Sequence, residues 1–371
     1  MSALRVGLLG YGRIAEAVHL PILTGLPGVE IVGIAEADPA RRAEALRRAP
    51  RAVASASFEH ILCRPDVDAV VICLPPALHA DAAVAALEAG KHVYLEKPIA
   101  TTLGDARRVL EASRHSPAVA MIGFNFRFSP LYRAARREIQ AGALGELVGV
   151  RSVFAASSRR LPPWKQTREG GGGALLDLAS HHVDLVRFLT GREVREVFAA
   201  VRSQRSEADT ATLHLRLADG LLVQSFVSLS AVDEDRLDIY GQAGGLAVDR
   251  YRSLGVETTR AGRPVRRTDW LLAPLRPLAR GASLLGRLRA PSYEPSYRAA
   301  LAHFVAAARA HRPTSPSFLD GSISLAVVEA AEESARTGRA VLCPSILVDD
   351  AADRPPQATR PELSEATPQE A

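Results

Sequence analysis

The chain has 371 residues, of which 47% are hydrophobic and 23% are charged, a composition that is ordinary for a folded protein with room for two domains. Its net charge of +5 comes from arginines interspersed with Asp and Glu, which lacks the basic face that nucleic-acid binding requires. No window reaches about 18 uninterrupted apolar residues and no apolar leader is visible, so we expect a cytoplasmic protein without a spanning helix or membrane contact. The three cysteines fit no metal-binding spacing, and we expect no metal site.

Apolar runs alternate with helical patterns through residues 1–124. Because these runs are apolar throughout, they indicate parallel strands that are covered on both faces, as in a doubly wound α/β sheet. We therefore predict an N-terminal Rossmann domain over residues 1–124. The predicted strands are residues 4–10, 29–38, 66–74, 91–96 and 118–124, and the predicted helices are residues 13–23, 41–49, 79–90 and 103–114.

A G-x-G-x-x-A sequence, residues 10–15, follows the first predicted strand and opens the first helix. In this context Gly10 permits a tight turn, Gly12 lets a pyrophosphate approach the backbone, and Ala15 lets the helix pack against the strand. The positive end of the helix dipole then faces the phosphates. We predict a dinucleotide-binding loop whose cofactor contacts are Gly10, Gly12, Arg13 and Ile14.

An acidic residue ends the second predicted strand. Glu36 lies 24 residues after Gly12, where a carboxylate can accept hydrogen bonds from the adenine ribose diol and would repel a 2′-phosphate. Arg41 and Arg42 follow a few residues later and could pair with such a phosphate. The cofactor is therefore NAD or NADP; the sequence favours NAD, and Glu36 and Arg41 are predicted cofactor contacts.

Two later strands end at the sheet edge where doubly wound folds bind ligands. Leu74 and Pro75 end one of them, and His79 begins the helix that follows. His79 either faces the cofactor or is simply a residue at a helix start. Glu96 and Lys97 end the next strand. We predict that all five residues contact the cofactor.

The lysine at position 97 is informative because only three of the 46 Lys and Arg residues are lysines. Arg keeps its charge on a flat fork, whereas Lys is a compact ammonium whose proton can be removed. Where the nicotinamide would lie, an ammonium can stabilise a developing alkoxide, and a lysine can also relay a proton. We predict that Lys97 is catalytic.

The pattern changes after Phe124 to runs that indicate an antiparallel sheet. Asp219-Gly220 predicts a hairpin turn, and Gly244-Gly245 predicts a second turn. We predict an α+β domain over residues 125–348 and a disordered tail over residues 349–371, which is rich in Pro, Ala and charge. The predicted strands are residues 145–157, 194–203, 211–230 and 236–251, and the predicted helices are residues 297–311 and 319–337.

Residues 170–191 run through four glycines into a helix that apolar side chains surround almost completely, which indicates burial. A buried carboxylate or imidazole must be paired. Asp177 and His181 are four residues apart and so share one face, with Asp184 three residues further along it. His182 points elsewhere and fits an interior histidine. We predict that Asp177 and His181 are catalytic; a purely structural pair is the alternative.

Taken together, these elements resemble the glucose–fructose oxidoreductase / inositol dehydrogenase family, Gfo/Idh/MocA. The likeness covers residues 4–343. It is carried by residues 10–15, by Glu96-Lys97-Pro98, by residues 172–177 continuing to His181, and by the segments GFNFRFSP and LDGSISLAVVEAAEESARTGRAV.

The resemblance implies that the second domain is built on an open, mainly antiparallel sheet, binds substrate, and forms a homodimer or homotetramer through that sheet. It implies NAD(P)-dependent hydride transfer between the nicotinamide and a secondary alcohol or ketone of a sugar, cyclitol or nucleotide sugar. It also implies that Lys97 touches the nicotinamide ribose and the reacting hydroxyl, that His181 is the general base or acid, and that Asp177 assists it.

Two other functions fit the same elements. One is a glycosidase that retains NAD and uses it for transient oxidation and elimination, and the other is a non-enzymatic NAD-binding sensor, which could dispense with Lys97 and His181.

The basic, leucine-rich segment 263–293 has three interpretations. It is a lid or oligomer arm, a source of arginines for a substrate diphosphate or carboxylate, or a segment that lies on an anionic membrane surface.

Overall fold

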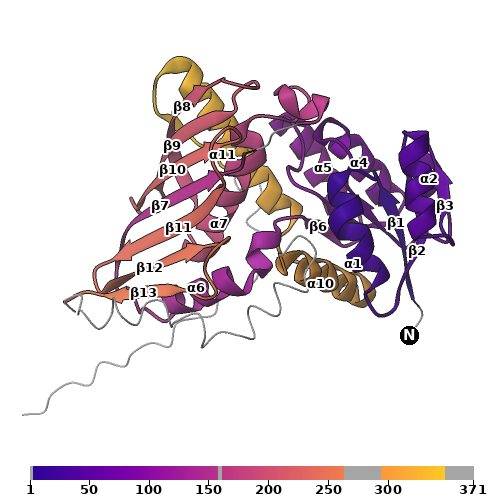
Figure 1. The fold of residues 1–371 in the computed structure, drawn as a ribbon, viewed down its shortest axis with the longest axis horizontal. Coiled ribbons are helices and arrows are strands. Elements are labelled where there is room, and N and C mark those ends of the chain that lie inside the picture. Colours follow the sequence, from indigo (N-terminus) through magenta and orange to yellow (C-terminus); the bar gives the residue numbers. More distant parts are fainter. Residues whose placement is uncertain (1–2, 158–160, 263–293, 347–371) are drawn as a thin grey trace, which may run out of the picture.

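The parallel sheet that the first third of the sequence predicts is present. A computed structural model of the chain describes residues 3–157, 161–262 and 294–346 (Figure 1). The interpretations of segment 263–293 and of the tail 349–371 fall outside these residues. Six parallel strands form the first sheet in the order β3-β2-β1-β4-β5-β6, which is the dinucleotide-binding order. They are β1 Leu4–Leu9, β2 Val29–Ala35, β3 Val53–Ser55, β4 Ala69–Ile72, β5 His92–Leu95 and β6 Ala120–Ile122.

Helices cover both faces of this sheet, and their ends follow local sequence signals. Asp38 accepts a hydrogen bond from the backbone of Arg41 at the start of one helix, and Thr102 accepts one from Asp105 at the start of another. The short β3 and the single helical turn after it escaped prediction, because three to five residues carry no clear period. The elements are η1 Ala15–His19, α1 Leu20–Thr24, α2 Pro39–Arg48, α3 Phe58–Leu62, η2 Pro76–Leu78, α4 His79–Glu88 and α5 Leu103–His115.

The chain then crosses to the second sheet and later returns. η3 Asn125–Phe128 and α6 Pro130–Gln140 make the crossing, and α10 Ser296–Ala310 packs back on the first domain, where Phe304 contacts the ring of Tyr94 (Figure 1). The first domain therefore contains residues from both ends of the sequence.

The second sheet has eight strands in the order β13-β12-β11-β7-β10-β9-β8-β14. All its pairs are antiparallel except β7 with β10, so the predicted mainly antiparallel sheet is confirmed. The strands are β7 Leu147–Ala155, β8 Val194–Arg202, β9 Thr210–Leu217, β10 Leu222–Ser228, β11 Glu234–Gly241, β12 Gly244–Asp249, β13 Glu257–Arg260 and β14 Val341–Leu342.

One predicted turn is displaced. The hairpin at Asp219-Gly220 is confirmed, but Gly244 and Gly245 begin β12, and the chain turns at residues 242–243. A Cβ atom on Gly244 would overlap the carbonyl oxygen of Thr259 in β13. The glycine at position 244 therefore reflects the close approach of a neighbouring strand rather than a turn.

Helices cover one face of the second sheet. They are η5 Leu175–Ala179, α7 Ser180–Thr190 and α11 Phe318–Thr337, and they lie between the two sheets (Figure 1). Along β9 exposed and buried residues alternate, so in the part of the chain that the structure describes the other face lacks such a cover. Because α7 lies between the sheets, its polar residues can meet residues of the parallel sheet. Within the described residues, no helix is both long and apolar enough to span a membrane.

Candidate active site

The glycine-rich loop has the shape that a pyrophosphate requires. Gly10 has φ of +89°, and a Cβ atom there would lie 2.7 Å from the carbonyl oxygen of Cys73. A Cβ atom on Gly12 would meet nothing closer than 3.9 Å. Ala15 is fully buried at the start of the helix, whereas Arg13 is exposed. The loop thus leaves open space beside backbone amides at a helix start, which fits a dinucleotide phosphate group.

The acidic residue after β2 faces this loop. Glu36 accepts hydrogen bonds from the backbone amide of Tyr11 at 2.8 Å and from that of Asp38 at 2.9 Å. Arg41 donates to the carbonyl oxygen of Tyr11 at 2.6 Å. The predicted carboxylate and the predicted arginine therefore lie at the same loop, as a contact with an adenine ribose requires.

His79 connects two turns at the carboxyl edge of the sheet. Its Nδ1 lies 2.6 Å from the carbonyl oxygen of Pro98, and its Nε2 lies 2.8 Å from that of Leu74. Burial lowers the pKa of His79, although the two carbonyl groups oppose that shift. The ring therefore holds the turn after β4 against the turn that carries Lys97. Contact of Leu74, Pro75 and His79 with a cofactor stays a prediction.

Glu96 points into the interior of the first domain. Its Oε1 lies 2.7 Å from Nε2 of His19, and both side chains are buried. His19 ends the π-helical turn η1 that follows the glycine-rich loop. This pair fixes the end of β5 against the helix of the loop. Direct contact of Glu96 with a cofactor stays a prediction.

Lys97 contacts Asp177, a pairing that the sequence did not predict. The Lys97 ammonium donates to the main-chain oxygen of Asp177 at 2.7 Å and to its Oδ1 at 2.8 Å. Only 14% of the Lys97 side chain and 12% of the Asp177 side chain are exposed. Because Lys97 follows β5 and Asp177 belongs to η5, this contact joins the parallel sheet to the buried helix. Its position beside the end of β5 makes it the centre of the candidate site.

A second lysine, which was not predicted as a site residue, shares this carboxylate. Lys165, in the short helix η4 Pro163–Gln166, lies 2.5 Å from Oδ2 of Asp177. Burial alone would raise the pKa of Asp177, but Lys97 and Lys165 outweigh it and hold that pKa well below the usual range. Two of the three lysines of the chain therefore converge on one ionised carboxylate. Lysine rarity was the one sequence signal that pointed to Lys165.

His181 follows in α7 and lies in an aromatic pocket. Its ring stacks on Phe126 with the centroids 4.6 Å apart, and Phe124 and Phe154 flank it at 6.1 and 6.2 Å. Its Nδ1 is buried and has no hydrogen-bond partner among the described residues. Burial, with Lys97 as the second cause, lowers the pKa of His181 well below its ordinary value. His181 is thus a neutral imidazole within electrostatic reach of the Lys97 ammonium.

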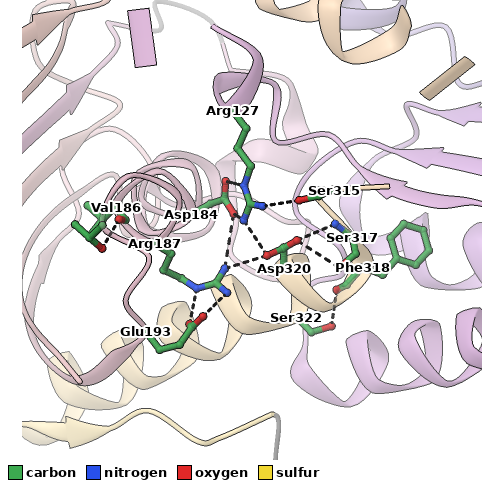
Figure 2. A network of polar contacts seen from close by, with 11 residues as sticks. Arg127, Asp184, Val186, Arg187, Glu193, Ser315, Ser317, Phe318, Asp320 and Ser322 are labelled. Atoms are coloured by element: carbon green, nitrogen blue, oxygen red, sulfur yellow. Dashed lines mark hydrogen bonds and ion pairs between the residues drawn. The ribbon is translucent and has the colours of Figure 1, made fainter. Parts of the chain in front are cut away.

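Asp184, which the helical spacing predicts on the face of Asp177 and His181, pairs with Arg127. Both oxygens of Asp184 accept hydrogen bonds from Arg127, from Nε at 2.9 Å and from Nη2 at 2.5 Å (Figure 2). A π-helical turn at Leu175–Ala179 precedes both His181 and Asp184, and in it the Ser180 amide bonds to the Leu175 oxygen five residues back. Such a turn holds one residue more than an α-helical turn and rotates the residues beyond it.

Arg127 and Asp184 belong to a buried network that joins helices. Arg127 also donates to Asp320 of α11 at 2.8 Å and to Ser315 at 3.1 Å, and Arg187 pairs with Glu193 (Figure 2). Burial raises the pKa of Asp184, with Arg127 opposing it. These residues fix α7 against α11, and so they support the site without entering it.

His182 has the structural role that its position suggested. Its Nε2 lies 3.2 Å from Oδ1 of Asp235, and Arg250 donates from Nε to Oδ2 of the same carboxylate at 2.6 Å. The ring of His182 stacks on Phe154. His182 is therefore a paired interior histidine on the side of α7 that faces the second sheet.

Known families match both halves of the chain. A family described as an oxidoreductase family with an NAD-binding Rossmann fold matches residues 4–124. A family described as the GFO/IDH/MocA C-terminal domain matches residues 132–247. The first match includes Lys97 and the second includes Asp177.

Individual relatives match over nearly the whole chain. The chain is 29% identical to an inositol 2-dehydrogenase of Rhizobium meliloti, over 91% of this chain and 98% of that one. It is 30% identical to a 1,5-anhydro-D-fructose reductase of Ensifer adhaerens, over 91% and 97%. A solved levoglucosan dehydrogenase in complex with NADH and levoglucosan superimposes with a TM-score of 0.80 at 26% identity, over 93% of this chain and all of that one. The chain therefore belongs to the Gfo/Idh/MocA family of oxidoreductases and carries the NAD-binding Rossmann domain of that family.

Proposed function

We propose that this enzyme transfers a hydride between NAD and a secondary alcohol or ketone of a cyclitol or sugar. The observation that carries the proposal is the meeting of the Lys97 ammonium with Asp177 beside a neutral, buried His181. These groups lie where the end of β5 meets the helix between the sheets. Oxidation of an alcohol needs a positive charge near the oxygen and a base for its proton, and both are present.

Each side chain has a distinct part in the proposed reaction. His181, which is neutral because burial disfavours its charge, accepts the hydroxyl proton during oxidation and returns it during reduction. Lys97 places its ammonium against the substrate oxygen and stabilises the alkoxide as it develops. Asp177 holds Lys97 in position through its carboxylate and its main-chain oxygen. A nicotinamide bound at the sheet edge supplies the hydride acceptor or donor.

NAD is the proposed cofactor in preference to NADP. The Glu36 carboxylate lies at the amide of Tyr11, and Asp38 follows two residues later. Two carboxylates at this end of β2 would repel a 2′-phosphate. Arg41 is turned toward the carbonyl oxygen of Tyr11, and this contact reduces its availability for a phosphate.

An uncharged polyol is the proposed substrate class. Relatives of the chain are named for inositol, levoglucosan and 1,5-anhydro-D-fructose, which are ring compounds with secondary hydroxyl groups or the corresponding ketone. These relatives are dehydrogenases and reductases, which favours net redox chemistry over the NAD-retaining glycosidase. A nucleotide sugar is the second substrate class to be assayed, because another relative is named as a dTDP-sugar reductase.

A homo-oligomer formed through the second sheet, located in the cytoplasm, completes the proposal. The sheet face that no described helix covers exposes large apolar side chains on several strands: Phe198, Leu222 and Tyr240. Such a patch is typical of a surface that another subunit covers. The three described cysteines are free thiols, as is usual in a reducing compartment.

The test is a panel assay. Purified protein is mixed with oxidised or reduced NAD or NADP and with myo-inositol, levoglucosan, glucose, 1,5-anhydro-D-fructose or UDP-glucose, and nicotinamide absorbance is followed. The proposal predicts net turnover with NAD and at least one polyol or its ketone. Turnover of a glycoside without any net change in nicotinamide absorbance would reject this proposal in favour of the NAD-retaining glycosidase.

A further inference from the structure

Lys165 has a role in the site that the proposed function does not yet assign. It contacts the second oxygen of Asp177, Oδ2, while Lys97 contacts the first, Oδ1. Its side chain is 23% exposed, so the Lys165 ammonium is mostly withdrawn from water. Two ammonium groups therefore share a single buried carboxylate.

Lys97 has two contacts to make that compete with each other, one with Asp177 and one with the substrate oxygen. An ammonium has three N–H donors, and Lys97 uses two of them on Asp177. To bind the oxygen of a substrate, Lys97 must turn at least part of its charge away from that carboxylate. A buried carboxylate that loses its partner is strongly disfavoured, which would hold Lys97 in place.

We propose that Lys165 is the standing counter-ion of Asp177, and that it frees Lys97 to leave the carboxylate for the substrate oxygen. This inference rests on the proposed function for the identity of the reaction. With Lys165 on Oδ2, the carboxylate stays paired whichever oxygen Lys97 contacts. Lys165 is accordingly a positioning residue, which acts on the reaction through Asp177 and Lys97.

The glycine run before Asp177 gives independent support for the role of Lys165, because it lets the backbone that carries Lys165 lie close to Asp177. A Cβ atom on Gly172 would overlap the carbonyl oxygen of Lys165, and a Cβ atom on Gly170 would overlap that of Trp164. The amide of Gly172 also bonds to the carbonyl oxygen of Thr167 at 2.9 Å. Gly170 and Gly172 therefore let the η4 backbone pack directly on the entry to η5, which brings the lysine to the carboxylate.

Further contacts anchor the segment that carries Lys165. Arg168 donates to Glu332 of α11 at 2.5 Å and to the carbonyl oxygen of Thr101 at 2.9 Å. The backbone amide of Glu207 bonds to the carbonyl oxygen of Gln166 at 3.1 Å. The position of Lys165 is thus fixed from both sides, as a permanent ion pair requires.

The third lysine supplies a matched control. Lys91 precedes β5 at the end opposite Lys97, and its ammonium donates to the carbonyl oxygens of Arg64 and Val67. A Lys91→Met variant removes one ammonium of the same kind without touching Asp177. We expect its turnover and its Lys97 reactivity to match those of the wild type.

The direct test needs no substrate and no cofactor. Trace labelling of the protein with acetic anhydride, read by mass spectrometry, reports how often the Lys97 amine is free. In Lys165→Met we expect Lys97 labelling to fall by roughly threefold or more, because Asp177 then depends on Lys97 alone. In an Asp177→Asn background the same change should have no effect, since no carboxylate remains. Unchanged Lys97 labelling in Lys165→Met, with a normal melting temperature, would overturn the inference.

Kinetics give the second readout. For Lys165→Met we expect kcat to fall by about 10- to 100-fold while the KM for NAD stays constant, and Lys165→Arg to recover part of the loss because it keeps a positive charge on Oδ2. A rise in substrate KM at constant kcat would instead mean that Lys165 binds substrate directly, and would reject the counter-ion role. Absence of any wild-type turnover would count against the proposed function, and the labelling experiment would still decide the role of Lys165.

Discussion

Lys97 and Asp177 lie 80 positions apart in the chain, and the ammonium of Lys97 contacts both the main-chain oxygen and the carboxylate of Asp177. This contact ties the end of a parallel strand to a buried helical turn that rests on the other sheet. The residues around the two sheets thus share one charged centre. Changes that separate the two residues should reduce turnover even where the fold persists.

Gly172→Ala is expected to disturb this centre without changing a polar group. The added methyl group would overlap the carbonyl oxygen of Lys165 and push η4 away from Asp177. We expect kcat to fall by roughly tenfold or more, since positioning errors near 1 Å have effects of this size. Gly104→Ala is the matched control, because its Cβ atom would meet nothing closer than 3.8 Å and it lies within α5. Equal activity of the two variants would contradict the packing argument.

Arg127→Met tests whether the network in Figure 2 is structural. It would remove both hydrogen bonds that Arg127 donates to the buried Asp184 and leave that carboxylate with the longer, 3.7 Å contact to Arg187, while Asp320 would also lose a donor. We expect the free energy of unfolding to fall by about 3–5 kcal/mol, measured by urea denaturation. Arg107→Met, an exposed change on α5, should stay within about 0.5 kcal/mol of the wild type. A loss below about 1 kcal/mol for Arg127→Met would show that the network is dispensable.

The pH dependence of stability should carry the signature of His181. Burial depresses the pKa of the folded form, so below the unfolded value of about 6.5 protons bind preferentially to the unfolded chain. The stability that neutral His181 contributes is therefore present above about pH 6.5 and lost as the pH falls below it. Between about pH 7 and pH 5, the melting temperature of the wild type should fall further than that of His181→Phe, which keeps the aromatic stack on Phe126. Parallel curves for the two proteins would mean that His181 titrates normally.

Glu36→Ala should weaken the preference for NAD. Removal of the carboxylate at the Tyr11 amide removes both the ribose acceptor and the repulsion of a 2′-phosphate. We expect the ratio of NAD to NADP affinity to fall by about tenfold or more. Fluorescence titration with the reduced cofactors measures it. If the ratio stays at the wild-type value, the assignment of Glu36 to the adenine ribose is wrong.

The sequence predicted the parts of the site that depend on regular patterns. Apolar runs with helices between them indicated the parallel sheet, and this sheet places Gly10 and Lys97 at its carboxyl edge. The run of polar residues in an apolar helix identified Asp177 and His181. These signals are local, so they can be read without knowledge of distant contacts.

Other features depend on contacts that no local pattern encodes. Asp184 pairs with Arg127, 57 residues earlier, and a π-helical turn precedes it in the chain. Such a turn has no sequence signature comparable to a capping residue or a proline. Lys165 lies in a short segment between prolines and glycines, where no period exists to place its side chain. Its convergence on Asp177 is a property of the folded chain alone.

Hydride transfer in single turnovers of Lys97→Met and His181→Ala tests the central claim most directly. The claim is that the Lys97 ammonium and the His181 imidazole act on the same substrate hydroxyl. With enzyme in excess over the polyol that the wild type turns over fastest, both variants should lose at least roughly 100-fold in rate, and saturating NAD keeps weaker cofactor binding by Lys97→Met from causing that loss. A rate within a few-fold of the wild type in either folded variant would contradict the account.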